Sequence, residues 1–226
     1  MYVTLPNAAT DPRQRGTVIA ILSSPLATRS VRRIAPGAHV FREGDAASHV
    51  YEVQTGILRL TRVLENGRRQ VIAFALPGDI VGFPNGDLHH TDCDAIGPCE
   101  VIPHRREALE NGEGNPETHR RLLKAALREI SAMQDHFMML ARKSATEKVA
   151  SFLMVLSERV SVQRGGLSTI ELKMKRADIA DFLGLTIETV SRTFTQLRNS
   201  GIISLQSAQS VVVLDADSLA EASEAA

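Results

Sequence analysis

The chain has 226 residues, in which 26 Lys plus Arg balance 26 Asp plus Glu, and it contains two Cys and no Trp. This length allows one large domain or two modest ones, and two cysteines are too few for a secreted disulfide framework. No apolar run approaches the roughly 20 residues that span a bilayer, and the amino terminus lacks a charged-then-apolar signal pattern. We therefore expect a soluble, cytoplasmic protein.

The first part of the chain is irregular. Residues 1–16 are polar, contain two Pro and show no periodicity, which is typical of a flexible tail. The apolar residues of 17–30 favour a short helix, and we place a folded unit over residues 17–114.

Most of that unit consists of short β-rich runs separated by glycine turns. The runs are 39–41, 49–53, 57–63, 70–75, 80–81 and 100–102. Asn66-Gly67 lies between two alternating runs and is a strong hairpin signal. Many short strands at even spacing predict an antiparallel barrel or roll.

Residues 115–142 return to a helical period, with apolar positions that alternate steps of four and three. This seam begins at His119 and continues through Leu123, Ala126, Ile130, Met133, Phe137 and Leu140. One interpretation is a helix packed on its own roll. We favour a coiled coil between two subunits, because Leu127, Met138 and Met139 lie off the seam and could cover the roll instead. The six apolar positions after His119 are thus the predicted dimer interface.

The last segment, 143–226, combines helical periods with short strand-like runs. After a hinge at 141–145 we expect a helix over 146–160, a strand-like run over 168–174 and two helices joined by a short turn within 175–203. Runs 202–205 and 211–214 predict a wing hairpin, and the acidic end after Asp215 predicts a frayed helix or tail.

The two-helix stretch carries the chemistry. Gly184 supplies the turn, Leu185 packs inward and Thr186 is a candidate N-cap. On the second helix one face is apolar, with Ile187, Val190, Phe194 and Leu197. The other face is polar, with Glu188, Ser191, Arg192 and Thr195. Arg can bind guanine by two hydrogen bonds, Glu can accept from cytosine, and Ser or Thr can serve either partner. Residues 142–198 also hold ten Lys or Arg against six Asp or Glu, which suits a polyanion.

These residues resemble a known family. LGLTIETVSRTF, with its E-x-x-S-R spacing, is similar to the recognition element of the Crp/Fnr superfamily of transcription regulators, in particular its FixK-like branch. The stretches IAPGAHVFREGDAASHVYEVQTGILRL and VIAFALPGDIVG resemble its cyclic-nucleotide-binding-type roll. The resemblance implies an α+β protein with an N-terminal antiparallel β-roll, a long dimerisation helix and a C-terminal winged helix-turn-helix.

By the same resemblance, a homodimer would read a TTGA-type palindrome and activate transcription through RNA polymerase. Glu188, Ser191 and Arg192 would read bases, with Arg192 on a guanine, while Thr189 and Thr195 add base or phosphate contacts. Arg176 and Lys175 are candidates for backbone phosphates. Lys175 stands where the family often has a capping Ser or Thr, so we expect that helix end to be less well capped.

The roll does not fit the cyclic AMP pattern of this superfamily. Gly78-Asp79-Ile80 matches only the start of the phosphate-binding turn, and the position of the phosphate arginine falls at about His89. A neutral His cannot replace a charged, bidentate guanidinium on a phosphate. We therefore expect no cyclic nucleotide.

The cysteines exclude one cofactor. Cys93 and Cys99 cannot supply the four thiolates of an iron–sulfur cluster, and no Cys precedes them. They remain a possible redox pair. His89, His90, Asp92 and Cys93 have metal-binding side chains but no recognised spacing, so we predict a polar loop there and no metal or other cofactor.

Two rival functions stay open. One is a sensor of the same family whose roll must bind a small ligand or metal before it binds DNA. The other is a metal-dependent roll enzyme, although the sequence contains no motif of a catalytic nucleophile or phosphate-binding loop. We predict a regulator and no enzyme.

Overall fold

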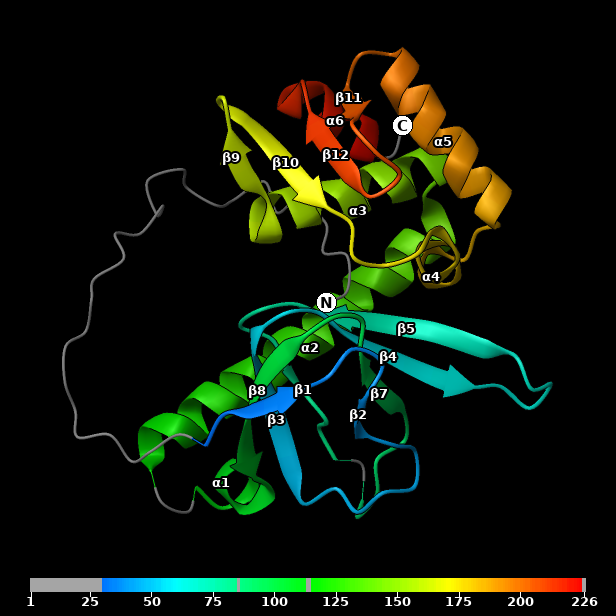
Figure 1. The fold of residues 1–226 in the computed structure, drawn as a ribbon. Coiled ribbons are helices and arrows are strands. Elements are labelled where there is room, and N and C mark those ends of the chain that lie inside the picture. The colour runs from blue at the N-terminus through cyan, green and yellow to red at the C-terminus, as the bar shows by residue number, and fades with distance from the viewer. Residues whose placement is uncertain (1–29, 85, 113–114, 225–226) are drawn as a thin grey trace.

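The computed structural model describes residues 30–84, 86–112 and 115–224. The tail expected over 1–16, and all but the last residue of the helix expected over 17–30, lie outside the described residues. Within them, the chain forms a β-roll, a long helix and a C-terminal part of helices around a small sheet (Figure 1). This confirms the predicted α+β fold class.

The β-roll consists of two four-stranded antiparallel sheets, with strand orders β1-β8-β3-β6 and β2-β7-β4-β5. Its strands are β1 (Arg32–Ile34), β2 (His39–Phe41), β3 (His49–Thr55), β4 (Leu58–Val63), β5 (Arg69–Ala75), β6 (Ile80–Val81), β7 (Asp92–Ala95) and β8 (Cys99–Arg105). The predicted hairpin joins β4 to β5, with Gly67 at φ 76° and the Arg68 N–H donating to Asn66 Oδ1 at 3.0 Å.

Sequence patterns missed β1, β7 and the short helix α1 (Arg106–Glu110). The prediction of a polar loop is wrong from Asp92 onward, because β7 is an inner strand that pairs with both β2 and β4. Aspartate is uncommon in β-strands. Here each carboxylate has a partner, since Asp92 accepts from the Glu43 N–H at 2.9 Å and Asp94 binds Arg59.

The long helix α2 (Pro116–Arg142) begins where the sequence predicts. Asn115 caps it by accepting from the Glu117 N–H at 2.8 Å, and Pro116 fills the first position, which needs no N–H donor. One side of α2 is fastened to the roll, because Arg121 donates to Glu52 Oε1 at 3.0 Å. No helix in the described ranges is long and apolar enough to cross a membrane.

The C-terminal part surrounds a sheet of strand order β11-β12-β10-β9. Its elements are α3 (Ala145–Val160), β9 (Val162–Arg164), β10 (Leu167–Glu171), α4 (Arg176–Leu183), α5 (Ile187–Asn199), β11 (Ile203–Leu205), β12 (Ser210–Val213) and α6 (Ala216–Ser223). Ser144 and Glu147 form a reciprocal capping box that starts α3 immediately after the hinge.

The frayed helix or tail expected after Asp215 is instead a packed helix. Asp215 caps α6 by accepting from the Ser218 N–H at 2.9 Å, and Leu219 is buried. The Lys143 ammonium group donates to the carbonyl of Ser223, the last residue of α6. The acidic, Ala-rich composition did not reveal this docking, because one buried leucine and a distant lysine supply it.

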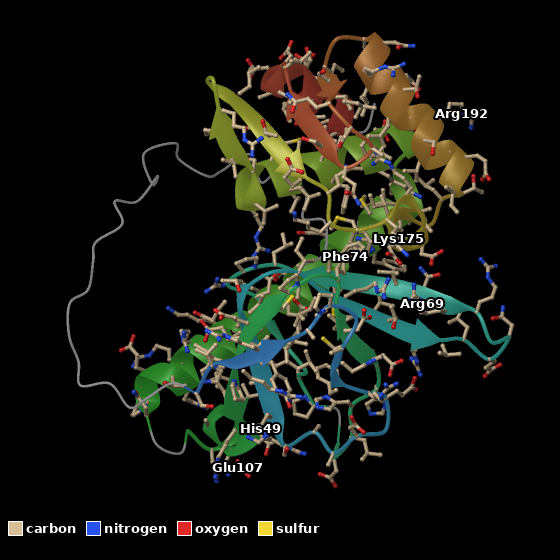
Figure 2. All side chains as sticks on the ribbon, in the orientation of Figure 1. His49, Arg69, Phe74, Glu107, Lys175 and Arg192 are labelled. Atoms are coloured by element: carbon tan, nitrogen blue, oxygen red, sulfur yellow. The ribbon has the colours of Figure 1, made fainter. Side chains whose placement is uncertain are left out.

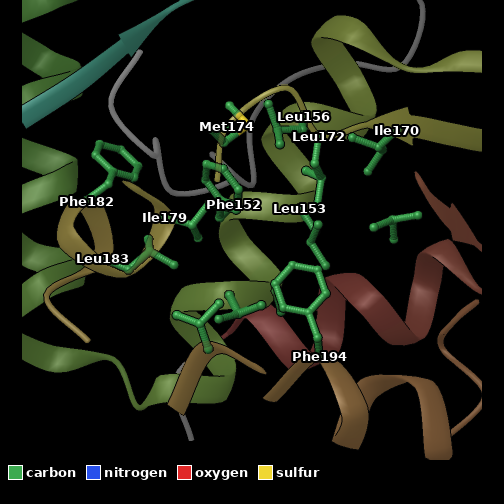
Figure 3. Packing of buried hydrophobic residues seen from close by; sticks show 14 of the residues in the cluster. Phe152, Leu153, Leu156, Ile170, Leu172, Met174, Ile179, Phe182, Leu183 and Phe194 are labelled. Carbon is green, nitrogen blue, oxygen red and sulfur yellow. The ribbon is translucent and has the colours of Figure 1, made fainter. Parts of the chain in front are cut away.

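The largest buried apolar cluster in the described part of the chain continues from the roll into the C-terminal part. Figure 3 shows the packing of its C-terminal residues. Phe74 of β5 meets Phe182 of α4 edge-on, with ring centroids 5.1 Å apart, and Phe182 also lies 5.9 Å from Phe152 of α3. On the other side of Phe182, the His136 ring of α2 stacks at 4.4 Å. Helix α4 is therefore held between the roll and α2.

The β3–β4 turn gives a first prediction. Gly56 has φ 83°, and a Cβ there would lie 2.5 Å from the Pro98 carbonyl oxygen and from Cys99 Sγ. A Cβ on Gly67, at φ 76°, meets nothing within 4 Å. Both Ala substitutions cost about 1–2 kcal/mol for the left-handed backbone, and the clash adds about 1–3 kcal/mol at Gly56 only. Urea unfolding of Gly56→Ala and Gly67→Ala measures the difference, and equal losses would contradict this packing.

A second prediction concerns pH. Burial, with a smaller contribution from the charge of Lys148, lowers the pKa of His136 to about 4, although a hydrogen bond to the Phe182 backbone acts in the opposite direction. The unfolded chain takes up this proton near its ordinary pKa of 6.5, before the native chain does. The contribution of His136 to stability is thus complete above pH 6.5 and lost as the pH falls toward 4.

Between pH 7 and pH 5 we expect the wild-type chain to lose about 2 kcal/mol more unfolding free energy than His136→Phe, which keeps a ring but cannot titrate. Denaturant unfolding of both proteins at each pH measures this. Parallel pH profiles would show that the native His136 titrates normally.

Candidate nucleic-acid interface

The turn between α4 and α5 has the geometry that its sequence predicts. Gly184 adopts φ 62°, ψ 40°, and the Leu185 N–H donates to the Ala180 carbonyl at 2.9 Å, which closes α4. Thr186 caps α5 by accepting from the Thr189 N–H at 3.1 Å. Lys175, the N-cap of α4, makes no side-chain cap, as expected.

Helix α5 has one buried face and one exposed face. Val190, Phe194 and Leu197 are buried, as predicted. The prediction that Ile187 joins them is wrong, because this first residue of the helix is 47% exposed. Thr193 is buried on this face instead, and its hydroxyl donates to the Thr189 carbonyl at 2.9 Å.

The predicted base-reading residues Glu188, Ser191, Arg192 and Thr195 are all exposed. Figure 2 shows Arg192 on the outer side of α5, away from the roll. Neither Glu188 nor Arg192 forms an ion pair with another described residue, so both side chains are available for an external partner. The Thr195 hydroxyl donates to the Ser191 carbonyl at 3.1 Å, which leaves its oxygen as an acceptor.

The two phosphate candidates lie in different environments. Lys175 is exposed beside the start of α4 (Figure 2). Arg176 is partly buried, with its guanidinium carbon 3.5 Å above the ring centre of Phe194 and Nη2 donating to the Ala208 carbonyl at 3.2 Å. Burial lowers the pKa of Arg176. Arg176 thus ties α4 to α5 and to the β11–β12 turn.

Thr189 is half-buried, and its hydroxyl is 3.0 Å from that of Thr186. Both side chains line an open groove of about 410 Å³ together with Arg68 of the β4–β5 hairpin. The groove therefore separates the start of α5 from the roll.

The predicted seam on α2 divides into exposed and covered positions. Leu123, Ile130, Met133 and Phe137 are exposed, and Phe137 is 70% exposed. Ala126 is half-buried. Leu140 is also half-buried and packs beside Gly184, under the turn between α4 and α5. We call Leu123, Ala126, Ile130, Met133, Phe137 and Leu140 the α2 seam.

The candidate effector residues of the roll differ in exposure, because His89 and Cys93 are buried, Asp92 is half-buried and His90 is exposed. His89 is 3% exposed and stacks on Phe41, with ring centroids 3.8 Å apart, and burial lowers its pKa. A buried, stacked imidazole thus lies at about the position that the resemblance assigns to the phosphate arginine. No group of three or more His, Cys, Asp or Glu within the described ranges is arranged to hold a metal ion.

Cys93 and Cys99 are free thiols and are both buried. Burial raises the pKa of each. The Cys99 thiol donates to the carbonyls of Ile57 and Gly97, both at 3.3 Å. Raised pKa values and lack of access work against the thiolate that redox chemistry requires.

Sequence reasoning missed one set of residues that position α4. Asp178, in the first turn of α4, is buried and forms ion pairs with Arg59 and Arg69 of the roll. The sequence offers only a weak signal, an acidic residue beside the apolar Ile179 and Ala180. Its partners are more than a hundred positions away.

Comparison with known proteins agrees with this geometry. Residues 31–111 match the cyclic nucleotide-binding domain family, and residues 147–222 match the Crp-like helix-turn-helix domain family. The nitrogen fixation regulation protein FixK of Bradyrhizobium diazoefficiens is 44% identical over 75% of this chain and 72% of its own length. FixK of Azorhizobium caulinodans is 36% identical over 94% of this chain and 84% of its own length.

A solved structure gives the same result in three dimensions. The structure of FixK2 from Bradyrhizobium japonicum superposes with a TM-score of 0.78 and 35% identity, covering 87% of this chain and 98% of that one. The two family matches, the similar relatives and the shared fold support the same assignment. The chain belongs to the Crp/Fnr family and is a transcriptional activator of the FixK type with a helix-turn-helix DNA-binding domain.

Proposed function

We propose that this activator binds a TTGA-type palindrome as a homodimer, without cyclic AMP or an iron–sulfur cluster. The observation that carries the proposal is the polar face of α5, on which Glu188, Ser191 and Arg192 are exposed while the opposite face is buried. In helix-turn-helix proteins such a helix enters the major groove. Arg192 contacts a guanine, Glu188 accepts from the facing bases, and Ser191, Thr189 and Thr195 add base or phosphate contacts.

The α2 seam supports the homodimer. A helix whose other side is docked on the roll still exposes Leu123, Ile130, Met133 and Phe137 to water. Pairing with the same seam of a second copy removes this apolar surface from water. It also places two recognition helices on one face of the duplex, which matches the two-fold symmetry of a palindrome.

The enclosed His89 supports binding without cyclic AMP. A phosphate diester needs a permanent positive charge with paired donors, and a neutral imidazole stacked on Phe41 supplies neither. The two buried cysteines are also too few for a four-thiolate cluster.

We further propose the division of the chain into a tail (1–16), the roll unit (17–114), the dimerisation helix (115–142) and the DNA-binding domain (143–226). The two family matches, 31–111 and 147–222, support the second and fourth parts. Lys175 binds a backbone phosphate, and Arg176 does so only if its contact with Phe194 opens. Contact with RNA polymerase accompanies activation in this proposal.

The direct test is fluorescence anisotropy of the purified chain on a TTGAT-N4-ATCAA duplex and on a scrambled duplex, at one stated salt concentration and with no added ligand. We expect tight, sequence-selective binding. Equal binding to both duplexes would refute the proposal. Selective binding that appears only after a metal ion or small ligand is added would favour an effector-gated sensor.

Arg192→Ala should lose about 1–3 kcal/mol of binding free energy per half-site and relax selectivity at one base pair of each half-site, because a bidentate guanine contact is removed. Arg198→Ala is the matched control, since Arg198 is an exposed arginine in the last turn of the same helix. Anisotropy on duplexes with single-base changes measures both variants. If Arg192→Ala weakened every duplex equally, Arg192 would be a phosphate contact.

Phe137→Asp should convert the dimer to monomers, because it places a charge within an apolar interface. Ser131→Asp, which adds the same charge at an exposed position of α2 outside the α2 seam, should leave the dimer intact. Sedimentation velocity gives the mass of each. A dimeric Phe137→Asp protein would place the interface elsewhere.

A further inference from the structure

The helix that precedes the recognition helix is fastened to the roll by a buried carboxylate. Asp178 has a side chain that is only 5% exposed, and its Oδ1 accepts from Arg59 Nη1 at 2.7 Å and from Arg69 Nη2 at 3.0 Å. Arg59 belongs to β4, Arg69 to β5 and Asp178 to α4. This contact therefore joins the two family-matched parts of the chain.

Arg59 is itself held in place by the roll. Its Nε and Nη2 donate to the two carboxylate oxygens of Asp94 on β7, at 3.2 and 2.8 Å, and its side chain is 17% exposed. A bidentate pair fixes the plane of a guanidinium. The remaining nitrogen, Nη1, is thus directed at Asp178. Because Asp178 is buried, a rotation of α4 that separates its carboxylate from the two arginines costs the pairing of that charge, whereas Arg59 keeps its pair with Asp94.

Other contacts hold the same helix in the same orientation. Gln70 of β5 donates to the Asp181 carbonyl, and Phe182 is enclosed between Phe74 of β5 and His136 of α2. Figure 2 shows Arg69 and Phe74 at the edge of the roll that faces the C-terminal part. Helix α5 follows α4 after the Gly184 turn, so its direction relative to α2 depends on how α4 is docked.

We propose that Asp178, through Arg59 and Arg69, is a positioning residue that sets the half-site spacing the dimer accepts. This role rests on the proposed function, because spacing has meaning only for a dimer on a palindrome. Asp178 touches no base. It fixes the angle between the dimer helix and the recognition helix, and hence the separation of two recognition helices related by a two-fold axis. With α4 released, two DNA-binding domains on a flexible hinge reach several spacings at a lower effective concentration.

The test compares two substitutions on one helix. Asp178→Asn removes the charge that the roll binds. Asp181→Asn removes a half-buried charge of the same helix, whose carboxylate forms no ion pair with another described residue. Both change the charge of the DNA-binding domain equally. Anisotropy is measured on palindromes with the half-sites separated by three, four, five and six base pairs, and on a duplex with one half-site.

We expect wild type and Asp181→Asn to share one preferred spacing. Asp178→Asn should bind that duplex about tenfold more weakly and discriminate less between spacings, with unchanged affinity for the single half-site. A spacing profile for Asp178→Asn that matches wild type would overturn the positioning role alone. If wild type shows no preference for any palindrome, the proposed function fails instead.

Two further measurements keep the test decisive. Arg69→Gln removes one donor whose side chain is 45% exposed, so it disturbs folding little and should reduce spacing discrimination in the same direction. Hydrogen exchange of free Asp178→Asn should accelerate in α4 and in β5 relative to Asp181→Asn, without DNA. Unchanged exchange, or an Arg69→Gln profile identical to wild type, would count against the role of Asp178.

Discussion

The docking of α4 is the constraint on which the rest of the structure depends. Three kinds of interaction meet on this eight-residue helix: the ion pairs of Asp178, the rings around Phe182 and the hydrogen bond to the Asp181 carbonyl. They come from the roll on one side and from α2 on the other. Because α5 is connected to α4 by one tight turn, everything that holds α4 also directs the face that carries Arg192.

The roll takes a direct part in this docking. The roll interior contains a ring stack of Phe41 and His89. Strands β4 and β5 supply the two arginines and the phenylalanine that contact α4. Through these contacts, the roll fixes the orientation of the helix that precedes the recognition helix.

Local signals predicted the parts of the chain whose geometry is decided within a few residues. Gly184, Thr186 and Asn66-Gly67 specify a turn, a cap and a hairpin through their own backbone, and each lies where the sequence places it. Partners far away in the chain decide the rest. Asp94 is tolerated in β7 only because Arg59 is there, and α6 is docked by Leu219 and Lys143. For the same reason, the sequence carries only a weak signal that Asp178 is buried.

The shared apolar cluster has a consequence for how the molecule unfolds. Phe74 and Leu76 of the roll are in the same cluster as Phe152, Ile179 and Phe182 of the C-terminal part. Separating the two parts would bring both sets of side chains into water, so neither part loses its packing independently. The two parts should therefore unfold together on heating, in a single cooperative transition. A C-terminal fragment produced without the roll would expose its half of the apolar cluster and be prone to aggregate.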